Sequence, residues 1–362
     1  MDNQFLNIVL SPFSLLYGLV TGFRNWLFDI GILKSTTLTL PVISIGNLAV
    51  GGTGKTPHTE FVLSALQHTW KSGMLSRGYK RETKGFYLAD ENSDSKTLGD
   101  EPFQIHRKFP EITVAVSEKR VRGIRKLQEA VPDLQLVVLD DAFQHRYVDP
   151  GFSILLTDYA NLYSRDMMLP SGQLREWKSG SKRADVIVVT KCPLNITPIE
   201  MRLVESELKP ETNQLLFFSS YVYQEIIPVF PELNQEVWTL DKIKERKASV
   251  LLVAGIVSPE PIILHLSTYS DEIKTLFFED HHTFQLKDFN RIDALFESLS
   301  SPDKLILVTE KDAARLLTSK TLPENLKPYI VALPIQVQIL HDQETLFIQK
   351  IKSYVVENTR NR

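Results

Sequence analysis

Residues 39–57 read TLPVISIGNLAVGGTGKTP and join a short apolar run to a glycine-rich loop. Gly54, Lys55 and Thr56 match the end of the phosphate-binding pattern G-x-x-x-x-G-K-[ST], but Ala49 stands where that pattern begins with glycine. Helical spacing follows from Lys55 to Trp70, so the segment predicts a strand, a loop and a helix. This is the context that a phosphate loop requires, and a plain glycine-rich turn is the alternative.

Apolar runs alternate with helical patterns along the next part of the chain. Such alternation predicts a parallel, doubly wound sheet. Together with the glycine loop, it leads us to expect a sheet of the P-loop NTPase type. The expected strands lie near 39–46, 74–78, 112–117, 134–141, 152–158, 185–190 and 215–220, and the expected helices near 55–70, 101–109, 118–130 and 198–209.

The alternation weakens after residue 220 and resumes near residue 248, which predicts a second, smaller α/β domain. Its expected strands are 248–256, 273–278, 304–309 and 329–333, and its expected helices are 259–270, 287–299 and a final one. We therefore expect four parts: an N-terminal helix (1–35), a large domain (36–220), a linker that can form a β-ribbon (221–247) and the smaller domain (248–362).

The N-terminal segment carries no charged residue from Asn3 to Phe23. Apolar residues recur there at helical spacing, which predicts an amphipathic helix. It can lie at a lipid interface, or it can pack its apolar face on its own domain. The apolar face holds Leu15, Leu16, Leu19, Val20, Phe23, Trp26, Leu27 and Ile30, and the other face holds Ser14, Thr21, Arg24, Asn25 and Asp29.

The composition is that of a folded α/β protein rather than of a nucleic-acid binder. The chain has 362 residues and a net charge of −3, so no overall positive field favours nucleic acid, and we expect no such partner. Cys192 is the single cysteine, which excludes an internal disulfide and a cysteine-based zinc site.

The glycine loop supplies the groups that bind phosphate. Glycines let backbone N–H groups turn inward, Lys55 can reach the outer phosphates, and the Thr56 hydroxyl can bind Mg²⁺. The candidate phosphate-binding residues are Ala49, Val50, Gly51, Gly52, Thr53, Gly54, Lys55 and Thr56.

Two acidic pairs are further candidates. Asp140 and Asp141 end the apolar run LVVL, as in a strand that holds Mg²⁺, and Gln144 follows at the mouth of the same site. Asp100 and Glu101 precede a predicted helix. Asp100 can cap that helix, or the acidic pair can accept the proton of an attacking hydroxyl.

Seven segments occur in one order that resembles the tetraacyldisaccharide 4'-kinase family, the lipid A 4'-kinases of Gram-negative bacteria. They are ISIGNLAVGGTGKTP, LSRGY, GDEP, LDDAFQH, LPSGQLRE, DHH and TEKDA, and they span nearly the whole chain. In that family the variant loop with Ala49 is usual.

The resemblance implies a P-loop kinase that uses ATP and Mg²⁺. It would transfer the γ-phosphate to the 4'-hydroxyl of tetraacyldisaccharide 1-phosphate, a lipid substrate, at the cytoplasmic face of the inner membrane. The N-terminal helix would then contact the membrane surface as a peripheral or monotopic element. No obligate protein partner is expected.

The resemblance also assigns roles to residues in the matching motifs. Asp100 would be the general base, and His281 would pair with it. Lys55 would contact the β- and γ-phosphates, and Glu176 would be a further acid of the active site. The remaining assignments are Thr56, Asp140 and Asp141 at Mg²⁺, with Gln144 beside the nucleotide.

Two other functions have to be weighed against this one. A P-loop NTPase of the metallochaperone type would carry a base-reading motif such as NKxD, whereas TKCP at 190–193 has the lysine without the aspartate. A nucleotide-binding membrane adaptor would not depend on Asp100.

Overall fold

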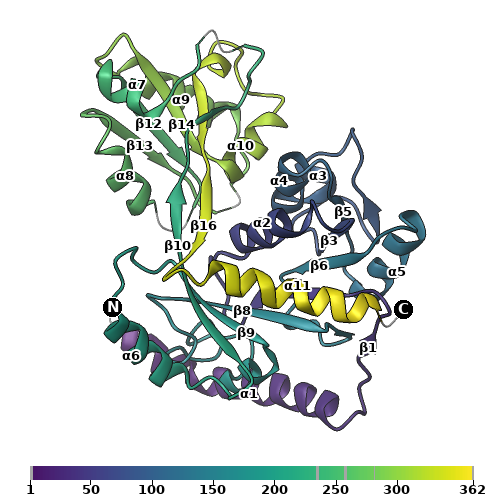
Figure 1. Ribbon diagram of the computed structural model, residues 1–362. Coiled ribbons are helices and arrows are strands. Elements are labelled where there is room, and N and C mark those ends of the chain that lie inside the picture. Colours follow the sequence, from purple (N-terminus) through teal and green to yellow (C-terminus); the bar gives the residue numbers. More distant parts are fainter. Residues whose placement is uncertain (1–2, 234–235, 257–258, 281, 361–362) are drawn as a thin grey trace.

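The computed structural model describes residues 3–233, 236–256, 259–280 and 282–360, with the side chains of residues 10–359. Figure 1 shows a larger domain, a smaller domain and a two-stranded connection between them. Both domains are α/β with mostly parallel sheets.

The larger domain is built on a nine-stranded sheet. The pairs at its two ends, β16–β10 and β4–β5, are antiparallel, and the pairs between them are parallel. In spatial order the strands are β16 (Ile335–Ile339), β10 (Leu215–Tyr223), β9 (Val186–Thr190), β8 (Phe152–Asp158), β2 (Val42–Asn47), β6 (Leu136–Asp140), β3 (Ser72–Ser76), β5 (Thr113–Val116) and β4 (Tyr87–Leu88). The predicted doubly wound sheet is thus confirmed in its strands and their parallel order.

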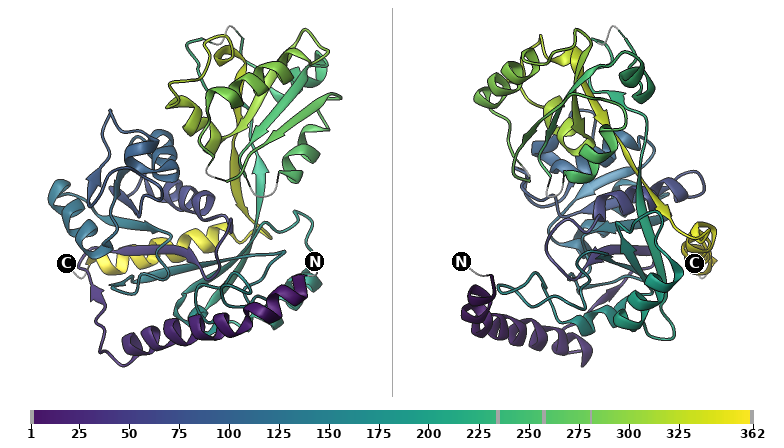
Figure 2. Two further views of the ribbon diagram at one scale, coloured as in Figure 1. Left: turned by 180° about the vertical axis from the view of Figure 1, so that it is seen from behind. Right: turned by 90° about the vertical axis from the view of Figure 1, so that its left-hand side faces the viewer.

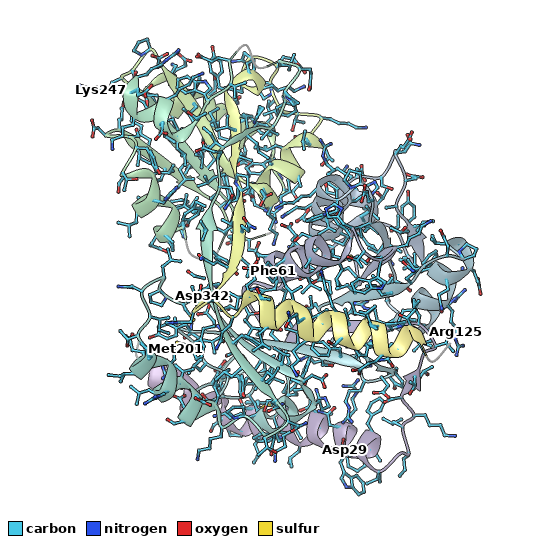
Figure 3. All side chains as sticks on the ribbon, in the orientation of Figure 1. Asp29, Phe61, Arg125, Met201, Lys247 and Asp342 are labelled. Atoms are coloured by element: carbon cyan, nitrogen blue, oxygen red, sulfur yellow. The ribbon has the colours of Figure 1, made fainter. Side chains whose placement is uncertain are left out.

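Helices cover both faces of this sheet. On one face α2, α4 and α11 share a core with the central strands, and Figure 3 marks Phe61 of α2 beside the start of α11. On the other face lie α5 and α6. The helices are α1 (Asn3–Asp29), α2 (Lys55–Leu66), α3 (Ser95–Leu98), α4 (Asp100–Lys108), α5 (Arg120–Ala130), α6 (Pro198–Leu208), α11 (Glu344–Arg360) and a short 3₁₀ turn, Lys178–Arg183. Strands β1 (Thr36–Thr37) and β7 (Val148–Asp149) form a separate parallel pair.

The smaller domain is a five-stranded sheet with helices on both faces. Its apolar cores lie against α9 and α10 on one side and against α7 and α8 on the other. The strands in spatial order are β11 (Ile227–Pro228), β15 (Ile330–Leu333), β14 (Lys304–Thr309), β12 (Ser249–Ala254) and β13 (Ile273–Phe277). The helices are α7 (Leu240–Glu245), α8 (Glu260–Leu266), α9 (Leu286–Glu297), α10 (Glu310–Leu317) and a 3₁₀ turn, Lys327–Tyr329.

The end of the chain differs from the expected division at residues 248–362. Strand β16 pairs with β10, and α11 then crosses the larger domain, as the yellow helix of Figure 1 shows. Phe347, Ile351 and Val355 of α11 are buried in the core of α2, which explains the placement. The connecting ribbon consequently consists of β10 and β16 rather than of residues 221–247 alone.

Helix α1 lies along the outside of the larger domain (Figure 2). Its polar side faces that domain, because Asn25 donates to Glu176 and the Tyr17 hydroxyl donates to the Arg175 carbonyl. Ser14 is buried and Tyr17 packs against the sheet, whereas Leu16, Leu19 and Phe23 are each about 60% exposed. The expected amphipathic helix is therefore present, and its apolar face does not pack on its own domain. Within the described residues, no helix combines the length and apolarity needed to span a bilayer.

Candidate active site

The glycine loop connects the end of β2 to the start of α2. Gly54 caps the helix in the left-handed region, with φ 86°, and Gly51 has φ 109°. A Cβ atom on Gly54 would stand 1.9 Å from the Tyr221 hydroxyl, so both the backbone conformation and the space require glycine. The loop therefore presents backbone N–H groups and the positive end of the α2 dipole at one place.

Neighbouring segments hold this loop in shape. Asn47 donates to the Thr53 hydroxyl at 2.7 Å, and the Thr190 hydroxyl at the end of β9 donates to the Thr53 carbonyl at 2.9 Å. The Val50 N–H donates to the Gln173 carbonyl, and the Arg175 N–H to the Leu48 carbonyl, both at 2.8 Å. Hydrogen bonds from neighbouring segments thus hold the loop in this conformation.

Lys55 lies at the mouth of the loop beside Asp141. Its Nζ is 3.9 Å from Asp141 Oδ2 and donates to the Gly51 carbonyl at 3.4 Å. These long contacts leave the ammonium group only loosely held. The Lys55–Asp141 contact shows that the glycine loop and the end of β6 meet.

Asp140 and Asp141 are adjacent in sequence but occupy different surroundings. Asp140 is buried and accepts hydrogen bonds from Thr59 at 3.2 Å and Ser76 at 3.4 Å. Burial, followed by the charges of Asp141 and Glu101, raises the pKa of Asp140 to about 6. Asp141 is one-third exposed, has φ 46° and pairs with Arg175 at 3.1 Å. The exposed carboxylate is therefore the one that faces the loop opening.

Arg175, Gln144 and Glu176 form a hydrogen-bonded chain behind Asp141. Arg175 Nη1 donates to Gln144 Oε1 at 3.2 Å, and Gln144 Nε2 donates to Glu176 Oε1 at 3.1 Å and to the Asn47 carbonyl at 2.6 Å. Glu176 is buried and also accepts from Arg183 Nη2 at 2.9 Å. Gln144 and Glu176 thus connect the loop after β6 to the segment that supports the glycine loop.

Helix α1 reaches the same chain of contacts. Asn25 donates to Glu176 Oε2 at 2.9 Å, and the Tyr17 hydroxyl donates to the Arg175 carbonyl at 3.1 Å. The Trp177 indole N–H donates to the Gly18 carbonyl at 2.7 Å, and Gly18 leaves room for that ring. Sequence analysis placed Asn25 on the polar face of the helix but could not give it a partner 151 positions away.

Asp100 begins α4 and meets the smaller domain. Arg315 of α10 donates from Nε to Asp100 Oδ2 at 2.9 Å, and Lys311 lies 2.9 Å from Glu101. Sequence analysis missed both cations, although TEKDA, at the start of α10, was among the motifs. The spacing of four between Lys311 and Arg315 was the available signal, since it places them on one face of a helix.

His281 lies outside the described residues, so its pairing with Asp100 stays a prediction. The next residue, His282, is held by Asp288 through a 2.9 Å contact to Nε2 and stacks on Phe278. His282 is thus held by side chains of its own, smaller domain.

The fold and the site define a two-domain, mostly parallel α/β protein with a glycine loop at a helix N-terminus and carboxylates around it. The family described as "LpxK: Tetraacyldisaccharide-1-P 4'-kinase" matches residues 6–355. The chain belongs to this family.

Relatives of the same name match over the whole chain. The tetraacyldisaccharide 4'-kinase of Bacteroides thetaiotaomicron is 48% identical over 100% of this chain and 97% of its own length. That of Flavobacterium johnsoniae is 43% identical over 98% of both chains. A crystal structure described as the "apo" form of LpxK from Aquifex aeolicus in complex with ATP superposes with a TM-score of 0.74. It is 28% identical and covers 97% of this chain and 99% of that chain.

Proposed function

We propose that the chain is an ATP-dependent kinase that phosphorylates the 4'-hydroxyl of tetraacyldisaccharide 1-phosphate, forming lipid IVA. The observation that carries the proposal is the meeting of the glycine loop, Lys55 and Asp141 in a chain that belongs to the 4'-kinase family. The ATP complex of the Aquifex aeolicus LpxK supports ATP as the phosphate donor.

The residues Ala49 to Thr56 would bind the phosphates of ATP as a P-loop. Gly51 and Gly54 set the turn, and the N–H groups at the start of α2 would donate to phosphate oxygens. Lys55 would leave its loose contacts and take the β- and γ-phosphate oxygens, where its charge opposes the charge that develops during transfer.

The oxygen-rich surroundings of Thr56, Asp140 and Asp141 suit Mg²⁺, which prefers hard oxygen ligands. Within the described residues, no group of three or more His, Cys, Asp or Glu side chains is arranged to hold a metal ion by itself. At a nucleotide, a Mg²⁺ ion usually binds one or two carboxylates, and phosphates and water complete its coordination. Thr56, Asp140 and Asp141 would hold the ion, which when bound neutralises phosphate charge.

Asp100 would act as the general base for the sugar hydroxyl. The hydroxyl oxygen bonds to the γ-phosphorus while the bond to the bridging oxygen breaks and ADP leaves with the electron pair. The hydroxyl proton passes to the Asp100 carboxylate. Such a base typically contributes about 10²- to 10⁴-fold in rate.

Helix α1 would rest on the membrane at the cytoplasmic face of the inner membrane. This placement is supported by a row of exposed apolar side chains on a helix whose polar side hydrogen-bonds to the larger domain. The row consists of Leu16, Leu19, Val20 and Phe23. Partial insertion of such a face suits a lipid substrate. Replacing Leu16, Leu19 and Phe23 by serine should abolish sedimentation with anionic lipid vesicles, and unchanged sedimentation would refute this placement.

The activity is tested with γ-labelled ATP, Mg²⁺ and tetraacyldisaccharide 1-phosphate in detergent. We expect the wild type to transfer label to lipid and Lys55→Ala and Asp100→Ala to lose the transfer. Phosphate release that needs Lys55 but ignores Asp100, without labelled lipid, would instead support an NTPase of the metallochaperone type. Nucleotide binding without turnover would support a membrane adaptor.

A further inference from the structure

Ion pairs join α4 of the larger domain to α10 of the smaller domain, beside an apolar cluster that includes Phe103 and Ala314. Lys311 and Arg315 lie one helical turn apart on α10 and face two consecutive acids, Glu101 and Asp100. Each pair has a closest N–O distance of 2.9 Å. Two adjacent carboxylates of one domain are therefore each matched with a cation of the other domain.

Arg315 is built firmly into the smaller domain. Its side chain is only 7% exposed, and Nη1 donates to Asp312 Oδ1 at 2.9 Å. Asp312 is fully buried and in turn accepts from the Gly255 N–H at 2.9 Å and from the Thr309 hydroxyl at 2.7 Å. The guanidinium thus approaches Asp100 from a fixed frame rather than from a flexible surface side chain.

The two cations differ in what they touch. Arg315 contacts the proposed base itself, while Lys311 contacts Glu101 at 2.9 Å and Asp280 at 2.9 Å. Asp280 also lies 3.7 Å from Arg315 Nη2. The charged side chains near Asp100 thus include Arg315, Lys311, Asp280, Asp312 and its own neighbour Glu101.

We infer that Arg315 is a positioning residue for phosphoryl transfer, through which the smaller domain orients the Asp100 carboxylate and keeps it ionised. The inference rests on the proposed kinase function. A planar guanidinium fixes the direction of a carboxylate better than an ammonium group does, and a neighbouring cation favours the charged carboxylate. The larger domain supplies the base, and the smaller domain sets its geometry, so the catalytic site is complete only when α10 and α4 are in contact.

The test compares Arg315→Gln with the matched variant Lys311→Gln, which removes the neighbouring interdomain pair without removing the contact to Asp100. We expect Arg315→Gln to lower kcat about 10- to 100-fold, as loss of a group that orients a reacting residue commonly does. The KM for ATP should stay within about twofold, because the proposed ATP site does not include Arg315. Lys311→Gln should lower kcat less than about threefold, because exposed or partly exposed ion pairs contribute little.

The pH profile distinguishes two roles for Arg315: orienting the Asp100 carboxylate, or only holding the two domains together. Without the guanidinium, a positive charge beside the Asp100 carboxylate is lost, so the acid limb of kcat/KM should move to higher pH. It should not move in Lys311→Gln. Equal losses in both variants, or an unmoved acid limb and near-wild-type kcat in Arg315→Gln, would overturn the inference.

Arg315→Lys keeps the test decisive if Arg315→Gln does not fold. The ammonium group retains the charge but not the planar geometry, so the acid limb should stay near that of the wild type while kcat falls about 10-fold. A full rate in Arg315→Lys would exclude orientation by the guanidinium. If the wild type itself transfers no label to lipid, the proposed function fails; if it transfers label and these variants behave like it, only the present inference fails.

Discussion

Asp100 and Glu176 are both acids that the family motifs place in the active site, but the structure surrounds them differently. Glu176 is 3% exposed and accepts from Asn25, Gln144 and Arg183, all of which belong to the larger domain. Asp100 accepts from Arg315 of the other domain. The contacts of Glu176 join parts of the larger domain to one another, whereas the contact of Asp100 forms only where the two domains meet. The contrast teaches that motif membership does not settle a role.

The largest expected effect separates the two acids by rate. Asp100→Asn should lower kcat for lipid phosphorylation about 10²- to 10⁴-fold, because the amide cannot take the hydroxyl proton. Its melting temperature should change little, since Arg315 keeps Asp312 as a partner. Steady-state assays with thermal unfolding of the same samples check both values. A kcat within about threefold of the wild type would remove Asp100 as the base.

The next largest effect is a pH dependence of the unfolding free energy, which comes from His58 inside the larger domain. His58 of α2 is buried, with Nδ1 2.7 Å from the Gly54 carbonyl and Nε2 2.9 Å from the Ser219 hydroxyl. A carbonyl only accepts, so Nδ1 carries the proton and Nε2 accepts from Ser219. Burial lowers the pKa of His58 from 6.5 to about 4, although the bond to Gly54 opposes the shift.

The sign of the stability change follows from these two values. Below pH 6.5 the unfolded chain protonates His58 while the folded chain does not until about pH 4, so the unfolding free energy falls as the pH falls through this window. The loss should reach roughly 3 kcal/mol. Urea unfolding at several pH values should show a flatter dependence in His58→Asn, which retains a donor toward Gly54. Parallel curves for the two proteins would contradict the buried neutral histidine.

Removing charge from Glu176 should affect stability more than chemistry. Three side chains donate hydrogen bonds to the Glu176 carboxylate: Asn25, Gln144 and Arg183. In Glu176→Gln an NH₂ group, which cannot accept, replaces one of the two carboxylate oxygens, and this should cost about 1–3 kcal/mol of unfolding free energy. The kcat of the folded protein should fall less than about 10-fold. Glu205→Gln, on the exposed side of α6, is the matched control and should change neither quantity. A loss of activity as large as that of Asp100→Asn, without destabilisation, would make Glu176 a catalytic acid and erase the contrast.

Much of this architecture could be predicted from the sequence, because the signals were local. The glycine loop, the apolar strands and the acidic strand end depend on neighbouring residues, and the expected strand at 152–158 coincides with β8. Periodicity alone cannot say which core an amphipathic helix joins. For that reason the sequence pattern assigns the final helix to the smaller domain, whereas Phe347 of α11 packs in the core that α2 shares with the larger sheet.

The partners of the site residues could not be predicted, because they come from distant parts of the chain. Asp100 and Arg315 are 215 positions apart, and Asn25 and Glu176 are 151 apart. The motifs marked the acids, but only the folded arrangement shows which cation or amide each one meets. Without those partners, the same acid can be assigned to catalysis or to structure.

The smallest expected effect tests whether α1, like Glu176, contributes mainly to the local structure of the larger domain. Trp177→Phe removes the hydrogen bond to the Gly18 carbonyl but keeps most of the ring that packs against the helix. We expect a cost of about 1 kcal/mol, the usual contribution of one hydrogen bond. The cost should be local, because α1 lies on the outside of the larger domain. Hydrogen exchange should then quicken in α1 amides near Gly18, while the exchange of α10 amides stays unchanged.

Trp238→Phe, in the smaller domain beside Arg246, serves as the control. Equal quickening in α10 would mean that α1 and the interdomain contact are coupled, so that the membrane-facing helix and the Asp100 pair form one unit rather than two.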